Sequence, residues 1–148
     1  MVRDGTDDDI ETLLPLAIKM HETSIYKDLE LDLEVVRKYA KGFVKDDWKY
    51  FRVYVGQDEV PSAFFMGFTT NYFFNNQILG CEENLFTNEK NPFAGIRLTK
   101  DFEKWCKKRG AVEMNFSVTH SGKPNGQYHK FMERMGYQEI GAIFKKRI

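Results

Sequence analysis

Two segments near the start of the chain carry apolar residues at helical spacing. The first follows Thr6, which can cap a helix, and repeats apolar side chains every three or four positions up to Ile18. The second follows Asp32, another capping residue, and its apolar side chains are Val35, Val36, Tyr39 and Phe43. The pattern predicts two amphipathic helices, preceded by a short strand at Val2 and Arg3.

Residues 50 to 86 have a different pattern, in which aromatic and β-branched side chains dominate. The segments GQDEVP and NN contain residues typical of turns and divide this region into three runs. We therefore expect three consecutive antiparallel strands, at residues 50–55, 62–70 and 77–86.

In the rest of the chain, segments with the apolar spacing of a helix alternate with segments that have the spacing of a strand. A helix with Leu98 and Phe102 on its apolar side is expected to end at Gly110, before a strand from Val112 to Val118. The segment QYHKFMERM predicts a short helix, and YQEIGAIFKKRI, residues 137–148, a closing strand. The order β α α β β β α β α β predicts one α/β domain over residues 1–148, an α+β arrangement with a mixed sheet of about six strands and about four helices.

Composition and charge narrow the class of protein. The chain has 148 residues, of which 42% are hydrophobic, enough for a packed core. Cys81 and Cys106 lack metal-site spacing, so we expect free thiols and no metal. No signal peptide or membrane span is recognisable, which favours a cytoplasmic protein without a membrane partner. Residues 1–87 hold 9 basic and 16 acidic side chains, whereas residues 88–148 hold 13 and 6, so the second half suits an anionic ligand.

The element order and the region from residue 77 to 137 resemble the GNAT superfamily of acyl-CoA N-acyltransferases. The segment NEKNPFAGIRLTKDFEKWCKKRGA resembles the loop and helix with which that family binds pyrophosphate, and ERMGY resembles its last helix end. The HKFMERMGY segment also resembles the ending of small phage-encoded members with eroded loops, which indicates a divergent, phage-encoded member of the family. The resemblance to the family implies a GNAT-like fold, acetyl-CoA as co-substrate, and acetyl transfer to an amine by direct attack in a ternary complex.

The resemblance implies a set of residues that contact acetyl-CoA. Oxyanion and pantetheine contacts fall on the backbone of Leu85, Phe86 and Thr87. The pyrophosphate loop covers Lys90, Phe93, Ala94, Gly95 and Ile96, and the conserved asparagine of the family matches Asn125. Phe93 stands where the family has glycine, and Pro92 removes one backbone donor, so fewer amides are expected to reach a phosphate. A plain strand-loop-helix turn with Phe93 in the core is the alternative.

Acetyl transfer to an amine needs a base, donors for the thioester oxygen and an acid for the leaving thiolate. Glu82 and Glu83 are the candidate bases, and as neighbours on a strand they are expected on opposite faces of the sheet. His120 is a further candidate base. Met132 occupies the position of the family's tyrosine acid, so Tyr128, one helical turn earlier, is the candidate substitute.

Two other functions remain open at this stage. Phe93 and Met132 are compatible with a GNAT-fold protein that has lost transfer activity and serves in binding or structure. A nucleic-acid-modifying transferase, with Trp48, Tyr72 or Phe73 stacking on a base, is compatible with the aromatic content, but zero net charge argues against a nucleic-acid partner. The acceptor amine, small molecule or protein, and the oligomeric state are not specified by the sequence.

Overall fold

The structure is a computed structural model that describes residues 1–87, 91–117 and 126–148, with only the backbone described for Pro92 and residues 126–128. It contains five strands and four helices in these residues. In chain order they are β1 (Val2–Asp4), α1 (Asp7–Thr23), α2 (Leu33–Lys45), β2 (Lys49–Val55), β3 (Pro61–Asn71), β4 (Ile78–Thr87), α3 (Pro92–Lys108), β5 (Ala111–Asn115) and α4 (Gly126–Arg134). No helix of the described residues is both long and apolar enough to cross a bilayer.

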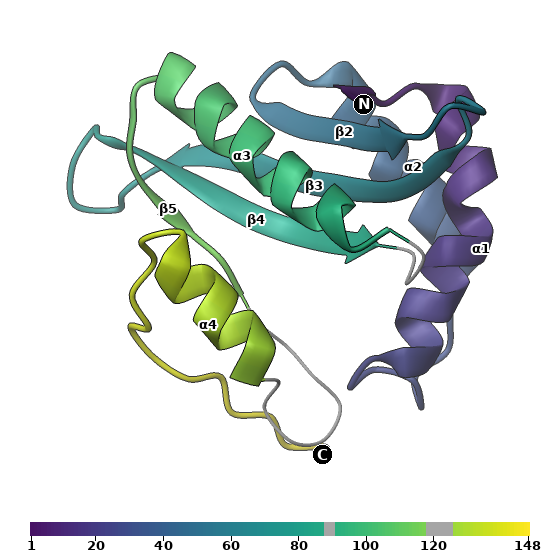
Figure 1. Cartoon of the computed structure of the whole chain (residues 1–148). Helices are drawn as coiled ribbons and strands as arrows, with labels where there is room; N and C mark the ends of the chain where they lie inside the picture. Colours follow the sequence, from purple (N-terminus) through teal and green to yellow (C-terminus); the bar gives the residue numbers. More distant parts are fainter. Residues whose placement is uncertain (88–90, 118–125) are drawn as a thin grey trace.

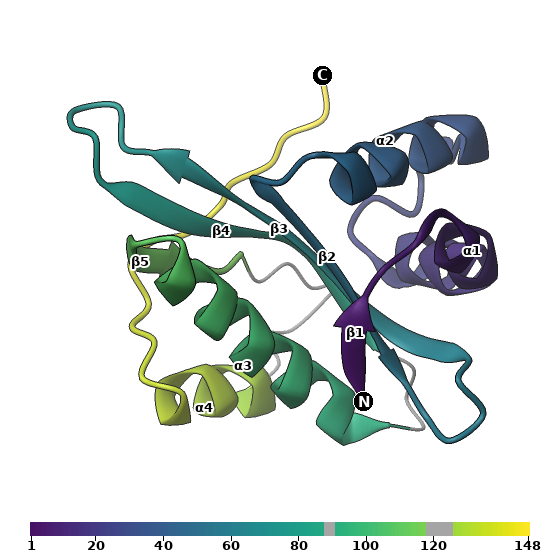
Figure 2. The same cartoon turned by 90° about the horizontal axis from the view of Figure 1, so that it is seen from above.

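The strands form one mixed sheet in the order β1-β2-β3-β4-β5. The pairs β1–β2, β2–β3 and β3–β4 are antiparallel, and β5 runs parallel to β4 after the crossover through α3. Helices α1 and α2 cover one face of the sheet, and α3 and α4 lie on the other (Figures 1 and 2). The mixed sheet and the four helices expected from the sequence are thus present.

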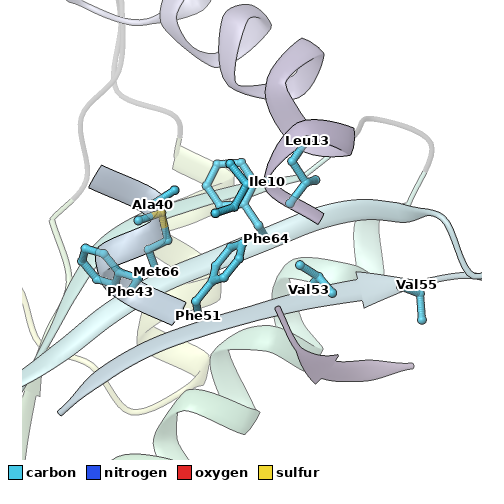
Figure 3. Packing of buried hydrophobic residues seen from close by; sticks show 9 residues of the cluster. All are labelled: Ile10, Leu13, Ala40, Phe43, Phe51, Val53, Val55, Phe64 and Met66. Carbon is cyan, nitrogen blue, oxygen red and sulfur yellow. The ribbon is translucent and has the colours of Figure 1, made fainter. Parts of the chain in front are cut away.

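The face under α1 and α2 is a core of aliphatic and aromatic side chains (Figure 3). Its buried members are Ile10, Leu13, Ala40, Phe43, Phe51, Val53, Val55, Phe64 and Met66. They come from alternate positions of β2 and β3 and from one side of each helix, as the two periodicities predict. Burying these side chains supplies the main driving force that holds the helical layer to the sheet.

The face under α3 is built from aromatic rings. Phe102 of α3 lies 4.6 Å from Phe65 and 5.0 Å from Tyr50, measured between ring centroids. Room for Phe102 comes from Gly67 on β3, since a Cβ there would lie 2.7 Å from the ring. Gly80 on β4 has the same role for Cys106, whose Sγ would lie 2.5 Å from an added Cβ. These close approaches hold α3 tightly against β3 and β4.

The start of α1 shows how the sequence sets a helix end. Thr6 and Asp9 form a reciprocal capping box. Both carboxylate oxygens of Asp9 also accept hydrogen bonds from the Arg3 guanidinium, at 2.6 and 2.8 Å. The Arg3 hydrogen bonds hold the pKa of the Asp9 carboxyl below its usual value, against the opposing effect of burial. This cluster ties α1 to β1.

Two expectations about elements are wrong. The closing strand at residues 137–148 is absent, so the sheet has five strands rather than about six. The alternation in this segment shows that it could form a strand, but Ile140 and Phe144 lie exposed and no edge pairs with it. In α2, Val35 and Tyr39 are also exposed, because the helix turns Ala40 and Phe43 toward the core.

Candidate functional site

Strands β4 and β5 separate partway along β4. Their pairing runs from Ile78 with Ala111 to Cys81 with Asn115, and β4 then continues alone on this side to Thr87. We call the region where Glu82–Thr87 of β4 no longer pair with β5, next to Phe116 and Ser117, the fork. In an antiparallel pair only every second residue bonds to its partner strand, so the other backbone groups of this segment point away from β3 into the fork.

A β-bulge lies at the start of the fork. Met66 of β3 pairs with Asn84 but the next residue, Gly67, pairs with Glu82, which leaves Glu83 as the extra residue. Glu82 therefore shares the face of Gly67, on which α3 packs. The bulge also brings Leu85, opposite Phe65, onto that face, although regular alternation would place it on the other.

The carboxyl group of Glu82 is partly buried in the fork. It accepts a hydrogen bond from the backbone N–H of Ser117, 3.2 Å away, just after β5. Burial raises the pKa of Glu82 to about 7, while the N–H groups of Ser117 and Leu85 oppose the shift because they favour the charged form. A carboxyl group with this pKa changes its charge near neutral pH.

The side chain of Glu83 points to the opposite face of the sheet, the one covered by α1 and α2. Its carboxylate accepts a hydrogen bond from the hydroxyl of Tyr39 on α2. Burial, with a further contribution from Glu83, raises the pKa of the Tyr39 phenol above its usual value. The two consecutive glutamates thus face different layers, and only the Glu82 carboxyl lies in the fork.

The end of β4 lies close to the start of α3. A Cβ on Gly95 would lie 3.3 Å from the Cγ2 of Thr87, so glycine permits this approach of helix and strand. Asn91 stands at the N-cap position without a side-chain capping bond, and its carbonyl accepts the N–H of Ala94 at 3.2 Å. Phe93 is 65% exposed and so does not belong to the core. The first turn of α3 thus has a buried Ala94 beside the exposed Phe93, a proline without an N–H, and one backbone amide that is already bonded.

Helix α4 ends at Arg134 and is followed by a turn in which Gly136 has a φ of +87°. The N–H of Tyr137 donates to the Met132 carbonyl at 2.9 Å, closing the helix end. Met132 is buried, and the Tyr137 hydroxyl donates to Glu103 of α3 at 3.1 Å. The backbone of Tyr128 lies in the first turn of α4, but its side chain is outside the described residues, so its role as an acid stays a prediction.

Three further candidates, Lys90, His120 and Asn125, also lie outside the described residues. Among the residues that are described, no group of three or more His, Cys, Asp or Glu side chains could hold a metal ion. Cys81 and Cys106 are free thiols, and burial raises the pKa of Cys106 to about 12.

A surface cavity of about 360 Å³ lies beside the start of β2, between Lys45, Lys49 and Trp105, and none of its lining residues belongs to the fork. Four of the charged side chains around it are paired within the protein: Lys49 bonds Asp46 at 2.7 Å, and Arg52 contacts Asp4. The fork, with its titratable carboxyl group, is the better candidate for chemistry.

Sequence reasoning missed two partners of the candidate bases. The Ser117 amide could not be found, because a backbone donor has no side-chain signature. Tyr39 was assigned to the apolar side of its helix, and its hydroxyl was the only signal that it could instead bond a carboxylate.

No protein-family model matches the sequence, and no curated protein matches it. Solved structures, however, are similar over the whole chain. An acetyltransferase from Trypanosoma brucei aligns with a TM-score of 0.72 and 12% identity, over 100% of this chain and 99% of that one. Glucosamine-6-phosphate N-acetyltransferase from Arabidopsis thaliana aligns with a TM-score of 0.76 and 12% identity, over 99% and 97%.

A transcriptional regulator from Bacillus halodurans aligns equally well, with a TM-score of 0.75 and 18% identity over 100% of this chain and 99% of that one. These likenesses show that the chain has the GNAT fold. At such identities they do not fix an activity, which has to be argued from the site.

Proposed function

We propose that this protein is an acetyl-CoA-dependent N-acetyltransferase that acts on an amine by direct attack in a ternary complex. The observation that carries the proposal is the Glu82 carboxyl in the fork, with its pKa raised to about 7. An amine must lose a proton to attack a thioester, and a base with a pKa near the working pH serves best. Glu82 is the residue to which we assign this role.

The backbone around Glu82 supports the same chemistry. The amide of Leu85 approaches the Glu82 carboxyl, so this N–H points into the fork. The amides of β4 from Leu85 to Thr87 that face away from β3 are the donors proposed for the thioester oxygen and the pantetheine chain. Acetyl-CoA supplies the activated acetyl group, while the strand supplies fixed donors that need no rearrangement during the reaction.

The start of α3 is the proposed pyrophosphate site. Gly95 lies beside Thr87, so a ligand that follows the end of β4 would reach the first turn of this helix, where the helix dipole favours an anion. Pro92 lacks an N–H and the Ala94 amide bonds Asn91, so the backbone offers fewer donors than an ordinary helix start. Lys90 and Asn125 are proposed to add side-chain contacts there.

The acid for the leaving thiolate is proposed to be Tyr128. Met132, one turn later on α4, is buried and has no proton to give. His120 remains an alternative base, and the acceptor is a small-molecule or protein amine.

The direct test is acetyl-CoA turnover, measured as release of the free thiol with a panel of amines. We expect activity to rise with pH through about 7, and Glu82→Gln to lower turnover by about 10² to 10⁴-fold. Glu83→Gln is the matched control, because its carboxylate faces α2, and it should keep most of the activity. Equal losses in both variants would contradict the assignment of the base.

A GNAT-fold binding protein without transfer activity is the second candidate function. Met132 at the acid position and Pro92 in the first turn of α3 favour it. It predicts that acetyl-CoA raises the melting temperature of the protein while no amine releases the free thiol. The absence of both effects would reject acetyl-CoA as a ligand and both functions with it.

A further inference from the structure

The hairpin between β3 and β4 ends in the exposed aromatic side chains of Phe73 and Phe74, next to the half-buried Tyr72. We call these three residues the aromatic tip. Phe73 is 99% exposed and Phe74 is 66% exposed. The Phe74 ring lies 5.0 Å from Phe73 and 5.1 Å from Tyr72, so the tip packs on itself. The hairpin projects past the neighbouring strands in two perpendicular views (Figures 1 and 2).

Polar groups in this turn bond to one another. The N–H of Tyr72 donates to the Gln77 carbonyl at 3.2 Å, and the Asn71 amide to the Asn76 carbonyl at 2.9 Å. The Asn75 side chain accepts the N–H of Gln77 at 2.9 Å. The sequence has no charged residue between Val60 and Cys81. Because these groups are paired and the turn carries no charge, the free-energy cost of moving the turn out of water is reduced.

Basic side chains lie at the base of the hairpin. Arg109, just after α3, donates from its Nε to the Thr69 hydroxyl of β3 at 3.4 Å. The exposed Lys107 and Lys108 belong to the last turn of the same helix. Phe73 is four residues beyond Thr69, about 13 Å along an extended strand. One acidic group is close, Glu113, which accepts a bond from the Tyr72 hydroxyl.

We propose that the aromatic tip and the lysines at the base of the hairpin bind the surface of an anionic lipid bilayer, with Phe73 and Phe74 inserted among the head groups. Two contributions hold a peripheral protein at such a surface. Apolar side chains enter the head-group region, and cations remain at the surface, where they attract the anionic lipids. The sequence argument against a membrane partner concerned spanning segments, and the tip is a surface contact.

Other occupants fit the tip less well. Three aromatic side chains offer a few hundred Å², less than the ~800 Å² that each partner contributes to an ordinary protein interface. The Phe73 and Phe74 rings are perpendicular, at 90°, so they do not present parallel faces to successive bases.

The test is cosedimentation with vesicles of phosphatidylcholine, alone or with phosphatidylserine. We expect the wild-type protein to bind only the anionic vesicles, less tightly as salt rises. The double variant Phe73→Ala with Phe74→Ala should bind at least tenfold more weakly, since two apolar side chains are lost. The double variant Lys107→Ala with Lys108→Ala should lose about fivefold for each lysine.

Phe144→Ala is the matched control, because Phe144 is 94% exposed but lies in the C-terminal segment, and it should bind like the wild type. All replaced side chains are exposed, and melting curves will show that the variants fold. Three results would overturn the proposal: no binding to anionic vesicles, equal weakening by Phe144→Ala, or tip-dependent binding to single-stranded DNA or to a second copy without binding to vesicles.

Discussion

Glu82 has an unusual environment for an acidic residue on a strand. An acid in a partly buried position costs free energy in its charged form, and here two backbone amides offset only part of that cost. Such a cost is tolerated where the group has a function, which is why a perturbed carboxyl group marks a candidate site. The same shift makes the stability of the protein depend on pH in a defined direction.

Glu82→Gln should stabilise the protein at pH 8 by about 1–3 kcal/mol and leave it nearly unchanged at pH 4.5. The folded protein holds the Glu82 proton more tightly than the unfolded chain. The stabilising effect is therefore present below the ordinary pKa near 4.5, and is lost as the pH rises to about 7. Urea unfolding of both proteins at the two pH values measures the difference. An equal difference at pH 4.5 and pH 8 would show that burial does not perturb this carboxyl group.

At the same scale, the sequence predicted part of the site. The side chains of two consecutive glutamates on one strand were predicted to lie on opposite faces of the sheet, because side chains alternate along any strand. The structure has Glu82 and Glu83 on opposite faces. Which of them lies in the fork depends on the bulge at Glu83, and nothing in the residue types of β4 marks a bulge. The Tyr39 hydroxyl and the Ser117 amide depend on tertiary packing, which a single sequence does not specify.

Among the elements, the contact between β4 and α3 positions the site. Gly80 of β4 faces Cys106 of α3, and this contact sets how close the helix lies to the strand. The helices and the hairpin could be predicted because their periods of 3.6 and 2 are visible in the sequence. The closing strand could not be excluded, since alternation indicates that a segment can pair but not whether an edge accepts it.

Gly80→Ala should destabilise the protein by about 1–3 kcal/mol, because the added Cβ overlaps the Cys106 sulfur. Cys106→Ala in the same chain should restore part of this loss, since it removes the overlapping atom. Thermal unfolding of the two single variants and the double variant gives the coupling between them. Strictly additive effects would mean that α3 shifts to accept the extra methyl group.

Across the whole molecule, the C-terminal segment contributes surface contacts rather than core. The Lys145 ammonium donates to the Ile25 carbonyl at 2.7 Å, and Arg147 pairs with Asp28 at 3.3 Å. These contacts join the basic end of the chain to the acidic segment between α1 and α2. Exposed ion pairs of this kind contribute little to stability.

Deleting residues 140–148 should therefore lower the free energy of unfolding by less than about 1 kcal/mol. Urea unfolding of the shortened chain measures the change, with the double variant Lys145→Ala and Arg147→Ala as the control that removes only the polar contacts. A loss of several kcal/mol from the deletion, with no effect of the control, would indicate that the segment pairs with an edge of the sheet as a sixth strand.

The bulge in β4 has a consequence for how this chain can tolerate a change in its length. Losing one residue from a paired strand normally moves every following side chain to the wrong face. Glu83 is different, because it has no partner on β3, and the pairs of Glu82 with Gly67 and of Asn84 with Met66 would become regular neighbours without it. A one-residue deletion at Glu83 would thus keep every side chain of β4 on its present face, including Glu82 and Leu85. In its pairing with β3, strand β4 thus has one position where a deletion is compatible with the register.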